Sequence, residues 1–576
     1  MSMNDSEDQT LRDRIAENPR PAMTWLAGLA VLVLLELGRF ADGLTNLGGI
    51  LQFTIDSLAS IPKGIGDNVG DQLGNVGNQL GSIAETLSLA IVALLLLAIF
   101  AGPIRSLLPK SPAVLLNLDN SPRIRLFVDR VVVTLGLAGL VLLVVATPFG
   151  SVVDAVVGAV ASGIDALSGA PSITSRDLIS NQGHQVPEGG WSGTFLGLSP
   201  AVAWAIRVAV VYAYAAALFY WLWRGYLTFR EHYREADWTP FDDSIDRMRG
   251  HRWGQFGFVV VFMFVVLALW APALGPVTAE ENHYQPYQNE FEYLGDNGEV
   301  QSTLHGSANI QTRSDGSSNV APMSYDQFGR WAPFGTNSDG KDLFTFLAYG
   351  ARTSLVIGLL AIGLSGSFAL MLSLLSSYYK GIVDLVAVLA SDTVQSIPAF
   401  LLILLLMVVF RESNHPLMDV YDGGILLALI LAFAYWPGLW RSIRGPALQI
   451  SEAEWIDAAK SFGQRPGVTM RKHMAPYVVV YMLIYASLIL GGIIITTAAL
   501  SFLGVGISAP TPEWGRMISE GRGTVSTRSW HVATIPGILI VLVVTGFNAL
   551  GDAVRDALDV ETDIGDSASE TSGGGV

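Results

Sequence analysis

The sequence predicts an all-α polytopic membrane protein with about ten transmembrane helices and both termini in the cytoplasm. Of its 576 residues, 51% are hydrophobic and only 15% are charged, whereas a soluble domain carries roughly 25% charged residues. The apolar residues gather in runs of roughly 18 to 25, the length that a helix needs to cross about 30 Å of hydrocarbon. These runs do not alternate in polarity over about ten residues, so a transmembrane β-barrel is not expected.

Ten apolar runs are long enough to cross a bilayer. They lie at 22–41, 85–103, 129–148, 200–223, 254–275, 351–375, 387–410, 423–440, 477–500 and 533–551. Basic residues collect at the cytoplasmic ends of spans, and a cytoplasmic N-terminus places sixteen of them inside. Three arginines are exceptions in an outer segment: Arg516, Arg522 and Arg528. The segments expected to face outward are 42–84, 149–199, 276–350 and 501–532.

Composition excludes several classes of protein. The chain has no cysteine, so it holds no disulfide or cysteine-ligated metal. Its net charge is −16 without a basic stripe, so nucleic-acid binding is not expected. Only six of the 34 basic residues are lysine, which favours a halophilic source over an ordinary acidic protein. The N-terminus lacks a basic region and a cleavage site, which favours an uncleaved cytoplasmic tail over a secretory signal.

The first 250 residues are expected to hold four spans and two outer amphipathic stretches. Apolar residues recur every three or four positions from Ile65 to Leu87 and again from Val152 to Leu167. These stretches either lie in the membrane interface or pack on the spans, and packing is favoured. Arg207 falls within the fourth span, near its outer end. It is either paired in a functional role or extended to the interface, and the extended form is favoured.

The most informative stretch is the polar segment from Glu452 to Gly463, which lies between two apolar runs. Glu454 favours a helix start, because an acid stabilises the positive end of the helix dipole. Gly463 favours its end. An apolar stripe at helical spacing lies between them: Trp455, Ala458, Ala459 and Phe462. Such a helix packs either on its own chain or on a partner protein, and local physics leaves both open.

This segment resembles the EAA loop of ABC-importer permeases in the dipeptide/oligopeptide/nickel branch. The family pattern is EAA, three residues, Gly, nine residues and an Ile-x-Leu-Pro-like end. The matching residues are Asp457, Ala458, Ala459, Gly463 and Pro476. The departures are Asp457 for Glu, His473 for Ile and Ala475 for Leu.

Other stretches resemble the same family in the same order. They lie at 332–355, 378–386, 392–402, 439–445, 500–518 and 547–559. Thr497 stands where many relatives have Glu, which puts the substrate preference or a gating contact in doubt. The resemblance covers roughly 254–560 and does not extend to 1–250.

The resemblance implies an ABC type I importer permease core with an N-terminal four-helix extension. The extension occupies 1–250, and 251–345 holds the first core span and an acidic extracellular segment. The permease transmembrane domain follows at 346–560, with its EAA loop at 451–476. A disordered tail is expected at 561–576.

The resemblance also implies a multi-pass protein of the cell membrane that imports a solute by alternating access. Its EAA helix is expected to dock on an ATPase through Glu454, Asp457, Ala458, Ala459, Gly463 and Pro476. The expected partners are a second homologous permease, two ABC ATPase subunits, an extracellular solute-binding protein and the lipid membrane. The chain has no GxxxxGK[ST] phosphate loop, so ATP and Mg are expected on the ATPase subunits. This chain is not expected to be an enzyme or to bind a metal.

Polar residues inside the core spans are candidates for the translocation path: Asp392, Gln395, Thr497 and Asn548. They either line a path or bond to neighbouring helices. Pro398 is expected to kink its helix. The solute is left open among dipeptides, oligopeptides, nickel and sugars. The alternatives to an importer are a membrane scaffold or a secondary carrier that is not coupled to ATP.

Overall fold

The computed structural model describes residues 11–41, 43, 129, 131–136, 149–234, 240–312, 319–413 and 416–558. The predicted span 85–103, the stretch from Ile65 to Leu87, most of the span 129–148 and the tail 561–576 lie outside these residues. The chain divides into two compact units, Met1–Leu32 with Ile173–Val576, and Val33–Ser172. In the second unit, α6 (Phe149–Ser168) is a 20-residue helix that covers the second predicted amphipathic stretch.

Six helical segments of the larger unit are long and apolar enough to cross a membrane. They are α7 (Pro200–His232), α9 (Arg252–Leu269), α12 (Leu343–Tyr379), Val420–Ser451 with α15 (Gly424–Ser451), Pro466–Phe502 with α18 (Ala475–Phe502), and α20 (His531–Leu558). α2 (Pro19–Leu35) is a shorter apolar helix at the predicted first span. The described residues therefore confirm a polytopic α-helical protein, while the total of ten spans stays a prediction.

The predicted span 387–410 is two helices, α13 (Gly381–Gln395) and α14 (Ala399–Glu412), which are bent by 75°. Pro398 lies at the break and is the N-cap of α14. Proline has no N–H to donate, and its ring disfavours helical geometry at the preceding residue. The predicted kink is confirmed. If the pair is one span, the described residues hold seven.

The core of the larger unit is built around α12 and α20. α12 packs against α15, α18 and α9, while α20 packs against α9 and α18. Gly257 of α9 lies so close to α20 that a Cβ atom there would be 2.6 Å from the Gly546 carbonyl oxygen. Glycine at this position therefore allows the two helices to approach closely. Trp514 is buried beside them and donates its indole N–H to the Leu347 carbonyl at 2.8 Å.

Part of the N-terminal region is packed directly on this core. Val211 and Tyr214 of α7 share one buried cluster with Trp270 and with Leu274 of α10 (Ala271–Leu274). The α2 helix joins through Tyr214, whose hydroxyl donates to the Leu32 carbonyl at 2.9 Å. The described residues of the predicted extension before Val33 and after Ser172 therefore belong to the same compact unit as the core.

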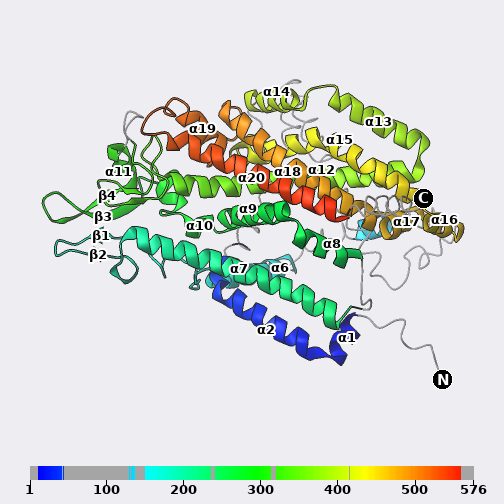
Figure 1. The fold of residues 1–576 in the computed structure, drawn as a ribbon, viewed down its shortest axis with the longest axis horizontal. Helices are drawn as coiled ribbons and strands as arrows, with labels where there is room; N and C mark the ends of the chain where they lie inside the picture. The colour runs from blue at the N-terminus through cyan, green and yellow to red at the C-terminus, as the bar shows by residue number, and fades with distance from the viewer. Residues whose placement is uncertain are drawn as a thin grey trace, which may run out of the picture. The chain divides into compact units, whose positions relative to one another are not determined.

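The remaining elements of this unit gather at the ends of the long helices (Figure 1). At one end are β1 (His184–Gln185), β2 (Trp191–Ser192), η1 (Phe195–Gly197), η2 (Glu280–Tyr284), β3 (Glu290–Leu294), β4 (Val300–Leu304), α11 (His305–Thr312), β5 (Ser324–Tyr325), β6 (Trp331–Ala332), η3 (Pro416–Met418), η4 (Val420–Gly423) and α19 (Trp514–Gly521). The strands form three antiparallel hairpins, β1–β2, β3–β4 and β5–β6. At the other end are α1 (Leu11–Glu17), α8 (Pro240–Gly250), α16 (Glu454–Ser461), α17 (Pro466–Thr469) and η5 (Met470–Met474). The charge distribution predicts that the first end faces outward and the second faces the cytoplasm.

Candidate functional site: a coupling helix and a candidate path

The polar segment between α15 and α18 contains the predicted helix, α16, from Glu454 to Ser461. Glu454 and Asp457 lie in its first turn, where acids are favourable. The chain leaves the helix through Gly463, whose φ of +73° is a left-handed conformation that suits glycine. The helix and its glycine end are confirmed as elements, while their docking role stays a prediction.

The side chains of α16 divide into one anchor and an open face. Ile456 is fully buried and fixes the helix to its own chain. Trp455 is 51% exposed, Phe462 just beyond the helix is 92% exposed, and Ala458 between them is exposed as well. Two large aromatic side chains beside a small residue form an apolar surface that the described chain leaves uncovered.

The predicted end of the EAA motif leads straight into a membrane helix. Pro476 lies in the first turn of α18, where its missing N–H leaves no helical hydrogen bond unmade. Met474 and Val478 on either side are fully buried and hold this turn in the core. The end of the EAA segment is therefore held in the core at the start of α18.

Three ion pairs, which we call the α13 ladder, join the α13 side of the unit to α15 and its end. Lys380 pairs with Glu452 at 2.9 Å, Arg444 pairs with Asp384, and Arg441 pairs with Asp392. Both carboxylate oxygens of Asp384 accept from Arg444, one of them at 2.8 Å. Glu452 immediately precedes the coupling segment, so the ladder ties α13 to the chain that enters α16. The individual charges are visible in the sequence, but their pairing could not be predicted from it.

The four predicted path residues fall into separate places. Asp392 and Gln395 both lie on α13, next to the break at Pro398; Asp392 pairs with Arg441, and Gln395 donates to the Ser391 hydroxyl at 2.9 Å. Asn548 of α20 is exposed, and its Oδ1 atom lies near Gly491 of α18. Thr497 is 1% exposed, and its hydroxyl has no hydrogen-bond partner among the described residues. No hydrogen bond or ion pair joins the α13 residues to the other two in the described part of the chain.

Arg207 does not reach the membrane interface, contrary to the favoured prediction. It is fully buried and donates to the carbonyls of Ile179 and Gly275, each at 2.9 Å. Gly275 also accepts from Arg176 at 2.6 Å. The chain folds over the end of α7 and supplies carbonyls to the two terminal nitrogens of the guanidinium, so the charge remains inside the protein.

Buried acids cap two helices at the predicted outer end. Asp342 is the N-cap of α12 and accepts from the Thr345 N–H at 2.6 Å. Burial raises the pKa of Asp342 to about 6. Glu513 caps α19 through the Arg516 N–H at 3.0 Å, and burial raises the pKa of this carboxyl too. Neither cap was singled out in the sequence.

Within the described residues, no group of three or more His, Asp or Glu side chains is arranged to hold a metal ion. The site consists instead of an exposed helix, charged ties and a few polar groups within spans.

Comparison with known proteins identifies the core. Residues 367–562 match the model of the binding-protein-dependent transport system inner membrane component family. The dipeptide transport system permease protein DppC of Alkalihalophilus pseudofirmus is 29% identical over 321 residues, which are 56% of this chain and 90% of the relative. The glutathione transport system permease protein GsiD of Escherichia coli O1:K1 is 29% identical over 323 residues, with the same shares.

The matched region contains α13 to α20, and therefore the exposed α16, the α13 ladder and the bent span. A permease of this kind is not itself an enzyme and works in a complex with ATPase and binding-protein partners. It is a multi-pass protein of the cell membrane. The chain is thus a permease subunit of a binding-protein-dependent ABC importer, in the branch that includes dipeptide and glutathione permeases.

Proposed function

We propose that this subunit moves short peptides into the cell and that α16 couples their movement to ATP hydrolysis on separate subunits. The complete transporter contains a second, homologous permease, two ABC ATPase subunits and an extracellular solute-binding protein. ATP and Mg are held by the ATPase subunits. The observation that carries this proposal is the uncovered apolar face of α16, formed by Trp455, Ala458 and Phe462.

The chemistry of that face suits a protein partner. Trp and Phe are large apolar anchors, and Trp is enriched among the residues that dominate binding at interfaces. Ala458 lets a partner backbone approach between them. Glu454 and Asp457 are both exposed and offer carboxylates to basic groups of the partner. A helix that served only its own fold would bury this face, as it buries Ile456.

Peptides are the favoured solute because the two relatives above transport a dipeptide and glutathione. The exposed amides of Gln395 and Asn548 are suitable groups for a path that carries peptide bonds, since an amide both donates and accepts hydrogen bonds. Asp392 lies on the same helix as Gln395, and its carboxylate is paired with Arg441. Thr497 is buried, so it would affect the path only indirectly, through the packing of α18 against its neighbours.

The proposal is tested by purifying the tagged chain in mild detergent and identifying the proteins that accompany it. A second permease and two P-loop ATPases are expected. Reconstituted with its binding protein, the complex is expected to take up a labelled dipeptide only when ATP is present. Purification of the chain alone would favour a membrane scaffold, and uptake driven by an ion gradient without ATP would favour a secondary carrier.

A further inference from the structure

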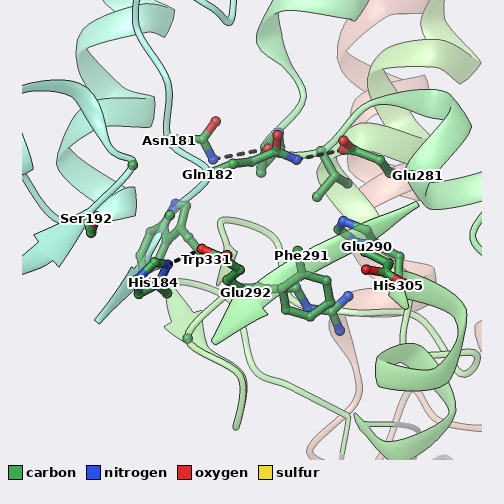
Figure 2. Close-up of a pocket in the computed structure, with 16 residues that line it drawn as sticks. Asn181, Gln182, His184, Ser192, Glu281, Glu290, Phe291, Glu292, His305 and Trp331 are labelled. Carbon is green, nitrogen blue, oxygen red and sulfur yellow. Dashed lines mark hydrogen bonds and ion pairs between the residues drawn. The ribbon is translucent and has the colours of Figure 1, made fainter. Parts of the chain in front are cut away.

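A cavity of about 300 Å³ opens at the predicted outer end of the larger unit (Figure 2). One wall comes from the loop before α7, with Gln182, His184 and Ser192. The opposite wall comes from β3 and the segment before it, with Glu281 and Phe291. The volume is at the lower end of the range for small-ligand sites. Because the N-terminal region supplies one wall, this cavity does not belong to the permease core alone.

The ionisable groups of the cavity leave an excess of negative charge. Three carboxylates line it, those of Glu281, Glu290 and Glu292. Arg330 is the one arginine among the lining residues, and its guanidinium already has partners within the chain. It pairs with Asp326 at 2.7 Å and donates to the Asn309 side chain at 2.8 Å. A cation entering the cavity would therefore meet carboxylates without strong competition from Arg330.

His305 does not cancel this charge at neutral pH, because burial lowers its pKa to about 4 and leaves its ring neutral there. His184 Nδ1 lies 3.1 Å from the Glu292 carboxylate, which is 63% exposed. Burial would raise the pKa of Glu281, but the Thr278 N–H and the charge of Arg176 lower it overall. Glu281 is thus a carboxylate at neutral pH.

Between the carboxylates the walls are apolar. Phe291 and Trp331 contribute aromatic rings, and Pro276 and Val277 contribute aliphatic surface. Figure 2 shows Phe291 and its neighbours Glu290 and Glu292 on the same strand, β3. The Arg330 guanidinium already lies over the Phe291 ring, 5.2 Å from its centroid, so Phe291 serves as apolar surface. Apolar walls suit the methylene stem of a long basic group.

We infer that this cavity binds an organic cation, namely an ammonium or guanidinium group carried on an apolar stem. The carboxylates of Glu290 and Glu292 accept its N–H groups, and Phe291 and Trp331 contact the stem. The cation has two sources with the same chemistry: a free amine or peptide outside the cell, or a lysine or arginine side chain of the extracellular binding protein. The inference rests on the proposed function only for the second source.

The absence of cysteine from the chain provides a direct test. Ser192 lines the cavity and is exposed, so a Ser192→Cys variant carries a single reporter thiol there. Val525→Cys is the matched control, because Val525 is 52% exposed and does not line the cavity. Intact cells expressing the full chain are treated with a membrane-impermeant maleimide, with and without agmatine, which carries guanidinium and ammonium groups on a four-carbon stem.

Agmatine is expected to slow the labelling of Ser192→Cys and to leave Val525→Cys unchanged. Adding Glu290→Gln and Glu292→Gln to the Ser192→Cys variant is expected to raise the half-protecting concentration about tenfold, since charge-assisted hydrogen bonds are lost. Equal labelling with and without agmatine, or protection that survives both substitutions, would overturn the inference. Reaction of the two thiols only after the cells are opened would also overturn it, since the cavity would then face inward.

A second arm separates the two sources. Purified binding protein is added to the Ser192→Cys variant without agmatine. Recovery of the binding protein with the variant is then measured as agmatine is added. Displacement of the binding protein by agmatine would assign the cation to one of its side chains, whereas unchanged recovery, with the thiol still protected by agmatine, would assign it to a free solute. Recovery of ATPase subunits with the same variants is measured in parallel, so that a failure of cation binding is distinguished from a failure of the proposed importer.

Discussion

The two ends of the larger unit differ in whether their large polar and aromatic side chains are exposed or buried. At the end with α16, Trp455 and Phe462 are largely exposed. At the end with α19, Trp514 is buried and its indole bonds to a backbone carbonyl, and Arg207 is buried with two carbonyl partners. The α16 end leaves these aromatic side chains open to a partner, while the α19 end buries its large side chains and gives them hydrogen-bond partners within the chain. An aromatic residue thus indicates a partner only where its surroundings leave it open.

Helix capping follows the same division. Asp342 and Glu513 accept backbone N–H bonds at the starts of α12 and α19. The N-cap of α16 is Ala453, which has no side-chain acceptor. A short helix without a cap is weakly stable by itself. Its position depends on Ile456 and on whatever covers its exposed face.

The largest expected effect is on partner binding at the α16 end. Ala458→Arg places a long charged side chain between Trp455 and Phe462, and we expect recovery of ATPase subunits to fall more than about tenfold, because close apolar packing is lost. Ala458→Ser keeps the small size and should retain the subunits. Both variants should unfold at the wild-type temperature, since Ala458 is exposed. An unchanged ATPase yield with Ala458→Arg would show that the partner binds elsewhere.

The next largest effect is on stability at the α19 end. Arg207→Met removes the donors to Ile179 and Gly275; the Ile179 carbonyl loses its partner, while the Gly275 carbonyl still accepts from Arg176. We expect a loss of about 1–3 kcal/mol in unfolding free energy, the cost of one buried group left unsatisfied. Thermal unfolding in detergent measures it, and Arg207→Lys should lose less. Wild-type stability in Arg207→Met would mean that these hydrogen bonds contribute little.

The pH dependence of stability should also differ between the ends. Asp342 has a folded-state pKa of about 6 against an unfolded value of 3.8, so the folded protein favours its protonated form. This contribution is complete below pH 3.8 and is lost as the pH rises through 6, by an amount of order 3 kcal/mol. Asp342→Asn keeps an oxygen for the Thr345 N–H and should flatten the decline. Equal slopes in both proteins between pH 4 and 6 would contradict the assignment.

A smaller effect is expected in the α13 ladder. Asp384→Arg and Arg444→Asp should each lower the unfolding temperature and weaken the dependence of transport on ATP. The double substitution restores opposite charges, and we expect it to recover about 1 kcal/mol of the loss. A double variant no better than the sum of the single ones would show that the pair does not couple α13 to α15.

The smallest effect is expected at Gly463. A Cβ atom there meets no neighbour within 4 Å, so Gly463→Ala tests the backbone alone. Its φ of +73° should cost alanine about 1 kcal/mol and reduce ATPase recovery modestly. Gly463→Asn should lie closer to the wild type, since asparagine tolerates this conformation better. Identical behaviour of the Ala and Asn variants would exclude backbone strain as the cause.

Local patterns predicted the parts of this molecule that depend on local physics. Apolar run length located the described spans, Pro398 located the break, and Gly463 located the end of α16. The fate of Arg207 could not be predicted in this way, because its partners lie at Ile179 and Gly275, in segments that only the folded chain brings to it. The α13 ladder was missed for the same reason, since ion pairs between helices depend on how the helices are registered.

The packing of α2 on α7, established above by the hydrogen bond from Tyr214 to Leu32, constrains the order of events in biogenesis. The indole of Trp25 donates to the Trp221 carbonyl and the indole of Trp221 donates to the Trp25 carbonyl, both at 3.0 Å. Gly28 lies against the Trp221 ring and Gly225 against the Trp25 ring, where a Cβ atom would collide with each indole. The partners are 196 residues apart, so the pair can close only after the ribosome has passed Gly225. The α2 helix is therefore synthesised well before the part of α7 that it packs against.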